Sequence, residues 1–222
     1  MAFDFEPSVM WESVPILLTA VKLTIVITII GLFFGFLLGA VAGLLKVSRG
    51  VLLRKLAGSY VESIRGTPLM VQVMFLYFGL PMAVGMRIAP LTAGIITIAL
   101  NSGAYIAEIV RGAVQSINPG QMEAARSIGL TRFQAMRYVV WPQALKRMIP
   151  PLGNQFIISL KDTSLLVVIG VGELTRTGQE IISVNFRAFE VWLTVAIIYL
   201  MLTMTISKIL NIVEEKVFHV KL

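Results

Sequence analysis

The 222-residue chain has no cysteine and a single histidine, His219, close to the C-terminus. A disulfide framework, a thiolate metal site and a cysteine nucleophile are therefore excluded. A single histidine is also too few for a histidine pair that would bind a metal or carry out catalysis. Charged residues make up 14% of the chain, whereas soluble domains carry about 25%. Hydrophobic residues make up 57%, and the mean hydropathy is +0.85. This composition excludes an ordinary soluble enzyme and predicts an integral membrane protein.

Five segments are long and apolar enough to cross the roughly 30 Å hydrocarbon layer of a membrane as helices. They cover residues 16–45, 57–80, 90–113, 150–172 and 188–212. The predicted fold is therefore all-α, with one transmembrane domain over the whole chain, 1–222, and five transmembrane helices. A cleavable signal peptide is not expected, because residues 1–14 contain no Lys or Arg.

The basic residues between these spans are distributed unequally. Twelve Lys and Arg residues lie in the segments 46–56 and 114–149 and in the tail from Lys208, whereas three lie in the connections on the other side. Because cytoplasmic loops carry the excess of Lys and Arg, the N-terminus is expected outside and the C-terminus in the cytoplasm. The net charge of +7 then reflects topology, and nucleic acid is not an expected partner.

The connection between the third and fourth spans is much longer than the others, which favours a functional segment with structure of its own. A short helix is expected over residues 121–128, ended by Gly129. Thr131 and Gln134 have the spacing of a capping box that opens a second helix. Pro142 is expected to stop that second helix.

The same connection contains Glu123-Ala124-Ala125, then three residues, Gly129, nine residues and Val139-Val140-Trp141-Pro142. This pattern resembles the EAA loop of permeases in ATP-binding-cassette (ABC) importers. The resemblance implies a type I importer permease fold and a coupling helix that docks on a cytoplasmic ATPase. The implied coupling residues are Glu123, Ala124, Ala125, Ser127, Gly129 and Pro142. From the residue types alone, the alternative is an amphipathic helix that rests on the inner leaflet of the membrane.

A second motif, Arg65-Gly66-Thr67-Pro68-Leu69-Met70-Val71-Gln72, lies inside the second predicted span. An arginine about 12 Å into a membrane helix needs a partner or a water-filled cavity, and Glu62 is the local candidate. Pro68 removes a hydrogen-bond donor and predicts a kink. The motif resembles permeases that import polar amino acids. The alternative is a Glu62–Arg65 pair that only shapes the helix bundle.

Lys161 and Asp162 are expected inside the fourth span, about 16–18 Å from its cytoplasmic end. Charges at such a depth are costly, so each side chain needs a partner. Three polar residues of the third span share one helix face: Asn101, Tyr105 and Glu108. One interpretation is structural, in which Lys161 forms an ion pair with Glu108 or Glu62 and holds the bundle together.

The other interpretation is a site for a zwitterionic amino acid. In this hypothesis Asp162 binds the ammonium group, Lys161 or Arg65 binds the carboxylate, and Asn101 and Ser164 supply neutral hydrogen bonds. The two interpretations are compatible if they apply to different conformations. The predicted substrate path consists of Glu62, Arg65, Asn101, Tyr105, Glu108, Lys161, Asp162 and Ser164.

Further strings extend the likeness over residues 10–213, including Ser102–Gly112 and Pro150–Gln155, and resemble the glutamine permeases of Gram-negative bacteria. This resemblance implies a multi-pass protein of the bacterial inner membrane that imports L-glutamine by alternating access. A periplasmic binding protein would deliver the amino acid, two permease chains would form the path, and two ATPase subunits would drive it. A basic amino acid, arginine or histidine, is the alternative substrate.

No P-loop string of the form G-x-x-x-x-G-K-[ST] occurs, so this chain is not expected to be an enzyme or to bind a cofactor. ATP and Mg²⁺ are expected on the partner ATPase. An ion-coupled secondary transporter is the competing class, but the sequence has no inverted repeat. No metal site is expected.

The first span repeats glycine at every fourth position: Gly31, Gly35, Gly39 and Gly43. Such a stripe of small residues allows two membrane helices to approach closely, so it predicts a packing seam. Five spans are too few to enclose a path for an amino acid. A dimer is therefore expected, either of two identical permease chains or of this chain with a paralogue.

Overall fold

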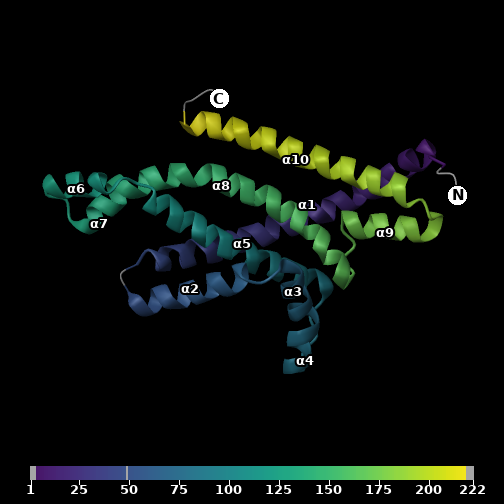
Figure 1. Cartoon of the computed structure of the whole chain (residues 1–222), viewed down its shortest axis with the longest axis horizontal. Helices are drawn as coiled ribbons and strands as arrows, with labels where there is room; N and C mark the ends of the chain where they lie inside the picture. Colours follow the sequence, from purple (N-terminus) through teal and green to yellow (C-terminus); the bar gives the residue numbers. More distant parts are fainter. Residues whose placement is uncertain (1–3, 49, 219–222) are drawn as a thin grey trace.

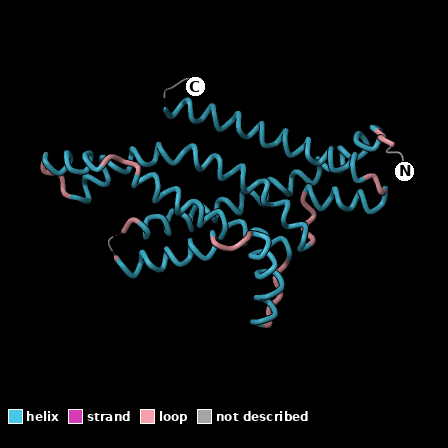
Figure 2. Tube along the Cα trace, viewed as in Figure 1, coloured by secondary structure: helices cyan, strands magenta, loops and turns pink. Residues whose placement is uncertain are grey.

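The computed structural model describes residues 4–48 and 50–218, and the regular elements in this part of the chain are helices (Figures 1 and 2). Arg49, His219 and Lys221 lie outside the described residues. The elements are α1 Pro7–Lys46, α2 Val51–Arg65, α3 Leu69–Met74, a π-helical turn Phe75–Gly79, α4 Leu80–Val84, α5 Pro90–Gln115, α6 Pro119–Ser127, α7 Arg132–Ala135, a second π-helical turn Met136–Val140, α8 Trp141–Asp162, a 3₁₀ segment Thr163–Ile169, α9 Leu174–Asn185 and α10 Ala188–Phe218.

The long helix α1 contacts α2, α5, α8, α9 and α10 and so forms the axis of the molecule. Figure 1 shows α6 and α7 at one end of this axis, and the N-terminus with the α9–α10 connection at the other. The helices α3 and α4 project sideways from the bundle (Figures 1 and 2). The two ends of the molecule therefore carry different structures.

Four helical segments of the described chain are each long and apolar enough to cross a membrane. They are Pro7–Lys46, Pro90–Gln115, Arg132–Ile169 and Ala188–Lys216. The pair Val51–Arg65 and Leu69–Val84 passes the same test together, but its halves are bent by 102°. The segment predicted as the second span, residues 57–80, is therefore built from two helices at a sharp angle.

The bend has a local cause at Pro68, where the sequence predicts a kink. In a continuous helix the amide of residue 68 would donate to the Ile64 carbonyl, and proline has no such N–H. Pro68 instead has extended backbone angles and precedes the first turn of α3. The kink is confirmed, and it is a complete break that places Arg65 at the end of α2.

The fourth span also differs from its prediction, because its helix begins well before residue 150. The second π-helical turn joins α7 directly to α8, and Pro142 lies in the first turn of α8, where a missing N–H is tolerated. The expectation that Pro142 stops the helix is wrong. Lys161 lies 20 residues after Trp141, the first residue of α8, about 30 Å along the helix, and its depth in the membrane stays a prediction.

The glycine stripe of α1 packs against α5, as the sequence predicts. A Cβ atom added at Gly39 would lie 2.6 Å from the carbonyl oxygen of Gly103, and one added at Gly43 would lie 2.6 Å from Cβ of Val110. Real side chains do not tolerate such distances. Glycine is therefore required for the close approach of α1 and α5, the pair of helices with the most extensive contact in the described chain.

Candidate functional site

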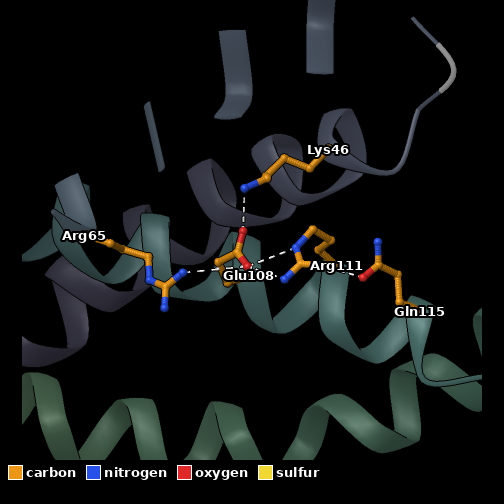
Figure 3. Close-up of polar contacts among 5 residues, drawn as sticks. All are labelled: Lys46, Arg65, Glu108, Arg111 and Gln115. Atoms are coloured by element: carbon orange, nitrogen blue, oxygen red, sulfur yellow. Dashed lines mark hydrogen bonds and ion pairs between the residues drawn. The ribbon is translucent and has the colours of Figure 1, made fainter. Parts of the chain in front are cut away.

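Glu108, on α5, lies at the centre of a charged cluster (Figure 3). One carboxylate oxygen, Oε1, accepts a hydrogen bond from Nζ of Lys46 at 2.5 Å. The other, Oε2, accepts from Nε and Nη2 of Arg111 at 2.9 and 2.6 Å. Nη1 of Arg65 lies 3.7 Å from the same oxygen. One carboxylate therefore joins the ends of α1 and α2 to α5, and three cations face one anion.

Arg65 is the loosest of the three cations. Its side chain is 41% exposed, against 13% for Lys46, and its guanidinium carbon lies 5.1 Å from the centre of the Tyr105 ring. Arg111 is also held by Gln115, one turn further along α5 (Figure 3). A guanidinium with unused N–H groups suits a carboxylate, so Arg65 is the member of the cluster best placed to bind one.

The structure brings together three of the predicted path residues, Arg65, Tyr105 and Glu108. It pairs Arg65 with Glu108, whereas the sequence suggested Glu62 as the local partner. Lys46 and Arg111 were not predicted as site residues. The i, i+3 spacing from Glu108 to Arg111 is a signal that could have identified Arg111. Lys46 comes from another helix, so no local pattern identifies it.

Asn101, another residue of the predicted substrate path, stabilises the break between α2 and α3. Its Nδ2 donates to Oε1 of Gln72 at 3.1 Å, and both side chains are buried. Gln72 Nε2 donates to the Ile64 carbonyl at 2.6 Å and to the Thr67 carbonyl at 3.0 Å. Gln72 thus gives its shortest hydrogen bond to the carbonyl that the missing amide of Pro68 would have served, which in the described chain otherwise accepts only long contacts of 3.4 Å from the Thr67 amide and hydroxyl. Asn101 positions Gln72, and a role in binding substrate stays a prediction.

Lys161, Asp162 and Ser164 lie where α8 passes into the 3₁₀ segment. Lys161 is exposed, and the other two side chains are half-buried. Among the described residues, Lys161 forms no ion pair with Glu62 or Glu108, so this structure does not contain the bridge that the structural interpretation requires. The substrate role of these three residues stays a prediction. No group of His, Asp or Glu side chains within residues 4–48 and 50–218 could hold a metal ion.

The predicted coupling helix is present as α6. Asn118 caps it by accepting a hydrogen bond from the Gly120 amide at 2.8 Å. Gly129 follows with φ +92°, in the left-handed region that favours glycine after a helix. The capping box is confirmed: Thr131 Oγ1 accepts from the Gln134 amide, and Gln134 Oε1 accepts from the Thr131 amide.

The predicted coupling residues occupy distinct positions on this segment. Ala125 is buried against the bundle, whereas Glu123, Ala124, Ser127, Gly129 and Pro142 are exposed. Ile128 and Phe133 flank them and are 80% and 73% exposed. An exposed surface that combines a capped helix with large apolar side chains suits contact with another protein.

Two side chains of α8 form hydrogen bonds with the end of α5 and with α6. Arg147 Nη1 donates to the Ser116 carbonyl at 2.6 Å and lies 3.0 Å from its hydroxyl oxygen. Gln143 Nε2 lies 3.3 Å from Oε1 of Gln121, in the first turn of α6. Side-chain hydrogen bonds therefore link α8 to α6 through Gln143 and to the end of α5 through Arg147.

Comparison with known proteins agrees with this arrangement. Residues 31–219 match the family of binding-protein-dependent transport system inner membrane components. The chain is 52% identical over 214 residues to the glutamine transport system permease protein GlnP of Escherichia coli (strain K12), covering 96% of this chain and 98% of that one.

Two solved structures are also similar. The crystal structure of an amino acid ABC transporter with histidines matches with a TM-score of 0.91 and 42% identity, over 97% of this chain and 100% of that one. An inward-facing structure of the MetNI methionine ABC transporter matches with a TM-score of 0.78 and 25% identity, over 96% and 99%. The chain therefore belongs to the family of binding-protein-dependent transport system inner membrane components, as a multi-pass membrane protein with the type I fold of ABC-importer permeases.

Proposed function

We propose that the chain is the permease subunit of an ATP-driven importer for a polar amino acid, with L-glutamine as its substrate. A periplasmic binding protein delivers the amino acid to a path formed by two permease chains, two copies of this one or this one with a paralogue. Two cytoplasmic ATPase subunits bind ATP and Mg²⁺ and drive alternating access. The N-terminus faces outward from the bacterial inner membrane, because twelve of the basic residues between spans lie on the other side.

The observation that carries this proposal is the geometry of α6. A capped helix with an exposed face stands at one end of the molecule and contacts α8 through Gln143, and Arg147 of α8 in turn binds Ser116 at the end of α5. A rigid link of this kind converts closure of a partner into tilting of the spans. Glu108 then joins α5 to α1 and α2, so the same tilt reaches Arg65 and the break beside it.

The absence of native cysteine makes this proposal directly testable. A Ser127→Cys variant carries one thiol on the exposed surface of α6, and a Val184→Cys variant carries one near the opposite end of the molecule. We expect a bifunctional crosslinker to join residue 127, and not residue 184, to the ATPase, with a yield that changes when ATP is added. Equal crosslinking at both positions, or none at residue 127 in a complex that copurifies, would contradict the docking role.

The choice of glutamine is supported by the 52% identity to a protein named for glutamine transport. In the proposed path Asp162 binds the ammonium group, Lys161 or Arg65 the carboxylate, and Ser164 a neutral group. We expect unlabelled glutamine to compete with labelled glutamine for uptake, and arginine and histidine not to compete. Competition by arginine at equal concentration would contradict the assignment of glutamine as the substrate, but it would not contradict the ATP-driven mechanism. Undiminished uptake by a Lys161→Met, Asp162→Leu double variant would exclude these two residues.

A further inference from the structure

The connection between α9 and α10 contains an unusual backbone conformation. Phe186 is the one non-glycine residue with positive φ, +57°, among residues 4–48 and 50–218. It follows the last residue of α9, and its amide donates to the Ile182 carbonyl at 2.9 Å. Glycine or asparagine is usual at this position because a β-carbon is unfavourable in the left-handed region. A phenylalanine here is a local cost that needs a reason.

Packing within the chain does not supply that reason. Phe186 is 85% exposed, and Val184, two residues earlier, is 81% exposed. A strained residue that persists without local compensation is typical of functional positions. Large exposed apolar side chains beside each other are typical of contact surfaces. The two observations are independent and fall on the same few residues.

The connection between α9 and α10, with Phe186 and Arg187, is called the corner below. The surrounding residues hold this corner in one shape. Asn185 Oδ1 accepts a hydrogen bond from the Arg187 amide at 2.9 Å. Arg187 Nη2 lies 2.8 Å from Oε2 of Glu6, and its Nη1 donates to the Asp4 carbonyl at 2.9 Å. Glu190 accepts from the Glu6 amide at 3.1 Å. The N-terminal segment is thus bound to the corner, and the backbone that carries Phe186 is fixed from both sides.

The rim of the corner is acidic. The side chains of Asp4 and Glu6 are 85% and 47% exposed, and one arginine, Arg187, stands between them. A lipid anchor explains these features poorly, because a fluid bilayer requires no fixed ring direction and lipid phosphates repel carboxylates. The surface suits a soluble protein with an apolar pocket bordered by Lys and Arg.

We infer that Phe186 is the anchor through which the permease docks its amino-acid-binding protein. The ring enters an apolar pocket of the receptor, and Asp4 and Glu6 pair with basic side chains at the edge of that pocket. The inference rests on the proposed function, which places this end of the molecule outside the membrane. Figure 1 shows the corner at the end opposite α6, so receptor and ATPase occupy separate surfaces. Buried aromatic anchors dominate the affinity of many interfaces.

The decisive variant is Phe186→Asn, because asparagine is favoured in the left-handed region and keeps the corner in shape while it removes the ring. The assay uses the whole complex, permease and ATPase, in nanodiscs, with the organism's purified glutamine-binding protein as the probe. We expect about 30-fold weaker binding, the loss typical of an interface hot spot. The midpoint of thermal unfolding is expected to be equal or slightly higher, because asparagine relieves the backbone cost, and the ATPase activity without receptor is expected to be unchanged.

Two further variants control this experiment. Phe186→Tyr keeps an aromatic ring and is expected to bind within about threefold of the unaltered protein. Leu52→Asn removes another exposed apolar side chain, 71% exposed at the start of α2, and is expected to leave binding unchanged. Asp4→Lys is expected to weaken binding, most strongly at low salt.

The outcomes separate the inference from the proposed function. If the unaltered complex neither binds the receptor nor responds to it, the proposed function fails. If it binds and Phe186→Asn binds within twofold of it, the anchor is wrong. A Phe186→Asn variant that unfolds at lower temperature in lipid but keeps its receptor affinity would assign the ring to the membrane and overturn the inference.

Discussion

Replacing Glu108 by glutamine removes the anion that three cations share and keeps the size of the side chain. The carboxylate and Lys46 are 16% and 13% exposed, so water screens their contact little. Removing one partner of a buried ion pair costs about 3–5 kcal/mol, and the lower value applies here because Arg111 is 34% exposed. Arg65 adds less, because it is more exposed.

A loss of about 3 kcal/mol lowers the midpoint of thermal unfolding, Tm, by about 6–12 °C for a chain of this size. The assay is thermal unfolding of the purified permease in detergent, followed by tryptophan fluorescence. The matched control is Glu180→Gln, which removes an ion pair of similar geometry, Arg176 Nε to Oε1 at 2.9 Å, on the exposed surface of α9. Such a pair contributes below about 1 kcal/mol.

A double-variant cycle sharpens the test. If Lys46 and Glu108 stabilise the bundle through each other, the Tm loss in the Lys46→Met, Glu108→Gln double variant is smaller than the sum of the two single losses. The reasoning is refuted if Glu108→Gln shifts Tm no more than Glu180→Gln does. That result would mean that the carboxylate contributes no more than a surface ion pair.

Four other substitutions test the remaining parts of the structure. Gly39→Ala places a methyl group 2.6 Å from a backbone carbonyl of α5, and we expect a loss of about 1–3 kcal/mol by thermal unfolding. Gln72→Ala leaves the carbonyls at the α2–α3 break without their buried donor, and we expect a loss of about 1–3 kcal/mol by the same measurement. Glu123→Lys and Gly129→Asp are expected to leave the protein in the membrane and to abolish ATP-driven uptake, measured in proteoliposomes.

The predictions for Gly39 and Gln72 each have a matched control. Gly112→Ala enters open space, with no atom within 4 Å of the added carbon, so it is expected to be neutral or slightly stabilising. A Gly39→Ala loss no larger than this would contradict the close packing of α1 and α5. Gln179→Ala removes an exposed amide on α9 and is expected to leave the midpoint of thermal unfolding unchanged. A Gln72→Ala loss no larger than this would contradict the role of Gln72 at the α2–α3 break. Undiminished uptake by Glu123→Lys would contradict the coupling role of α6.

Local patterns predict much of this fold. The apolar helices, the glycine seam and the capping box at Thr131 each depend on residues within a few positions of one another; the structure contains the seam and the capping box, and four of its helical segments are long and apolar enough to span a membrane. The break at Pro68 was predictable for the same reason, since a missing amide acts on a carbonyl four residues earlier. The family pattern also placed α6 and Gly129 correctly.

Other features depend on contacts between distant residues. The 102° bend is fixed by Gln72 and Asn101, which are 29 positions apart. Arg65 forms an ion pair with Glu108 on another helix, and not with its neighbour Glu62. The effect of Pro142 was misjudged because a preceding π-helical turn allows α7 to continue into α8. The left-handed conformation of Phe186 has no sequence signal, since its residue type disfavours it.

The central claim is that this chain passes an amino acid through the membrane at the expense of ATP hydrolysed by a partner. The most direct test is uptake of labelled glutamine into proteoliposomes that contain this chain and its ATPase, with ATP inside and the binding protein outside. We expect uptake that stops when either ATP or the binding protein is omitted. Uptake without ATP, driven by an ion gradient, would contradict the claim and identify a secondary transporter.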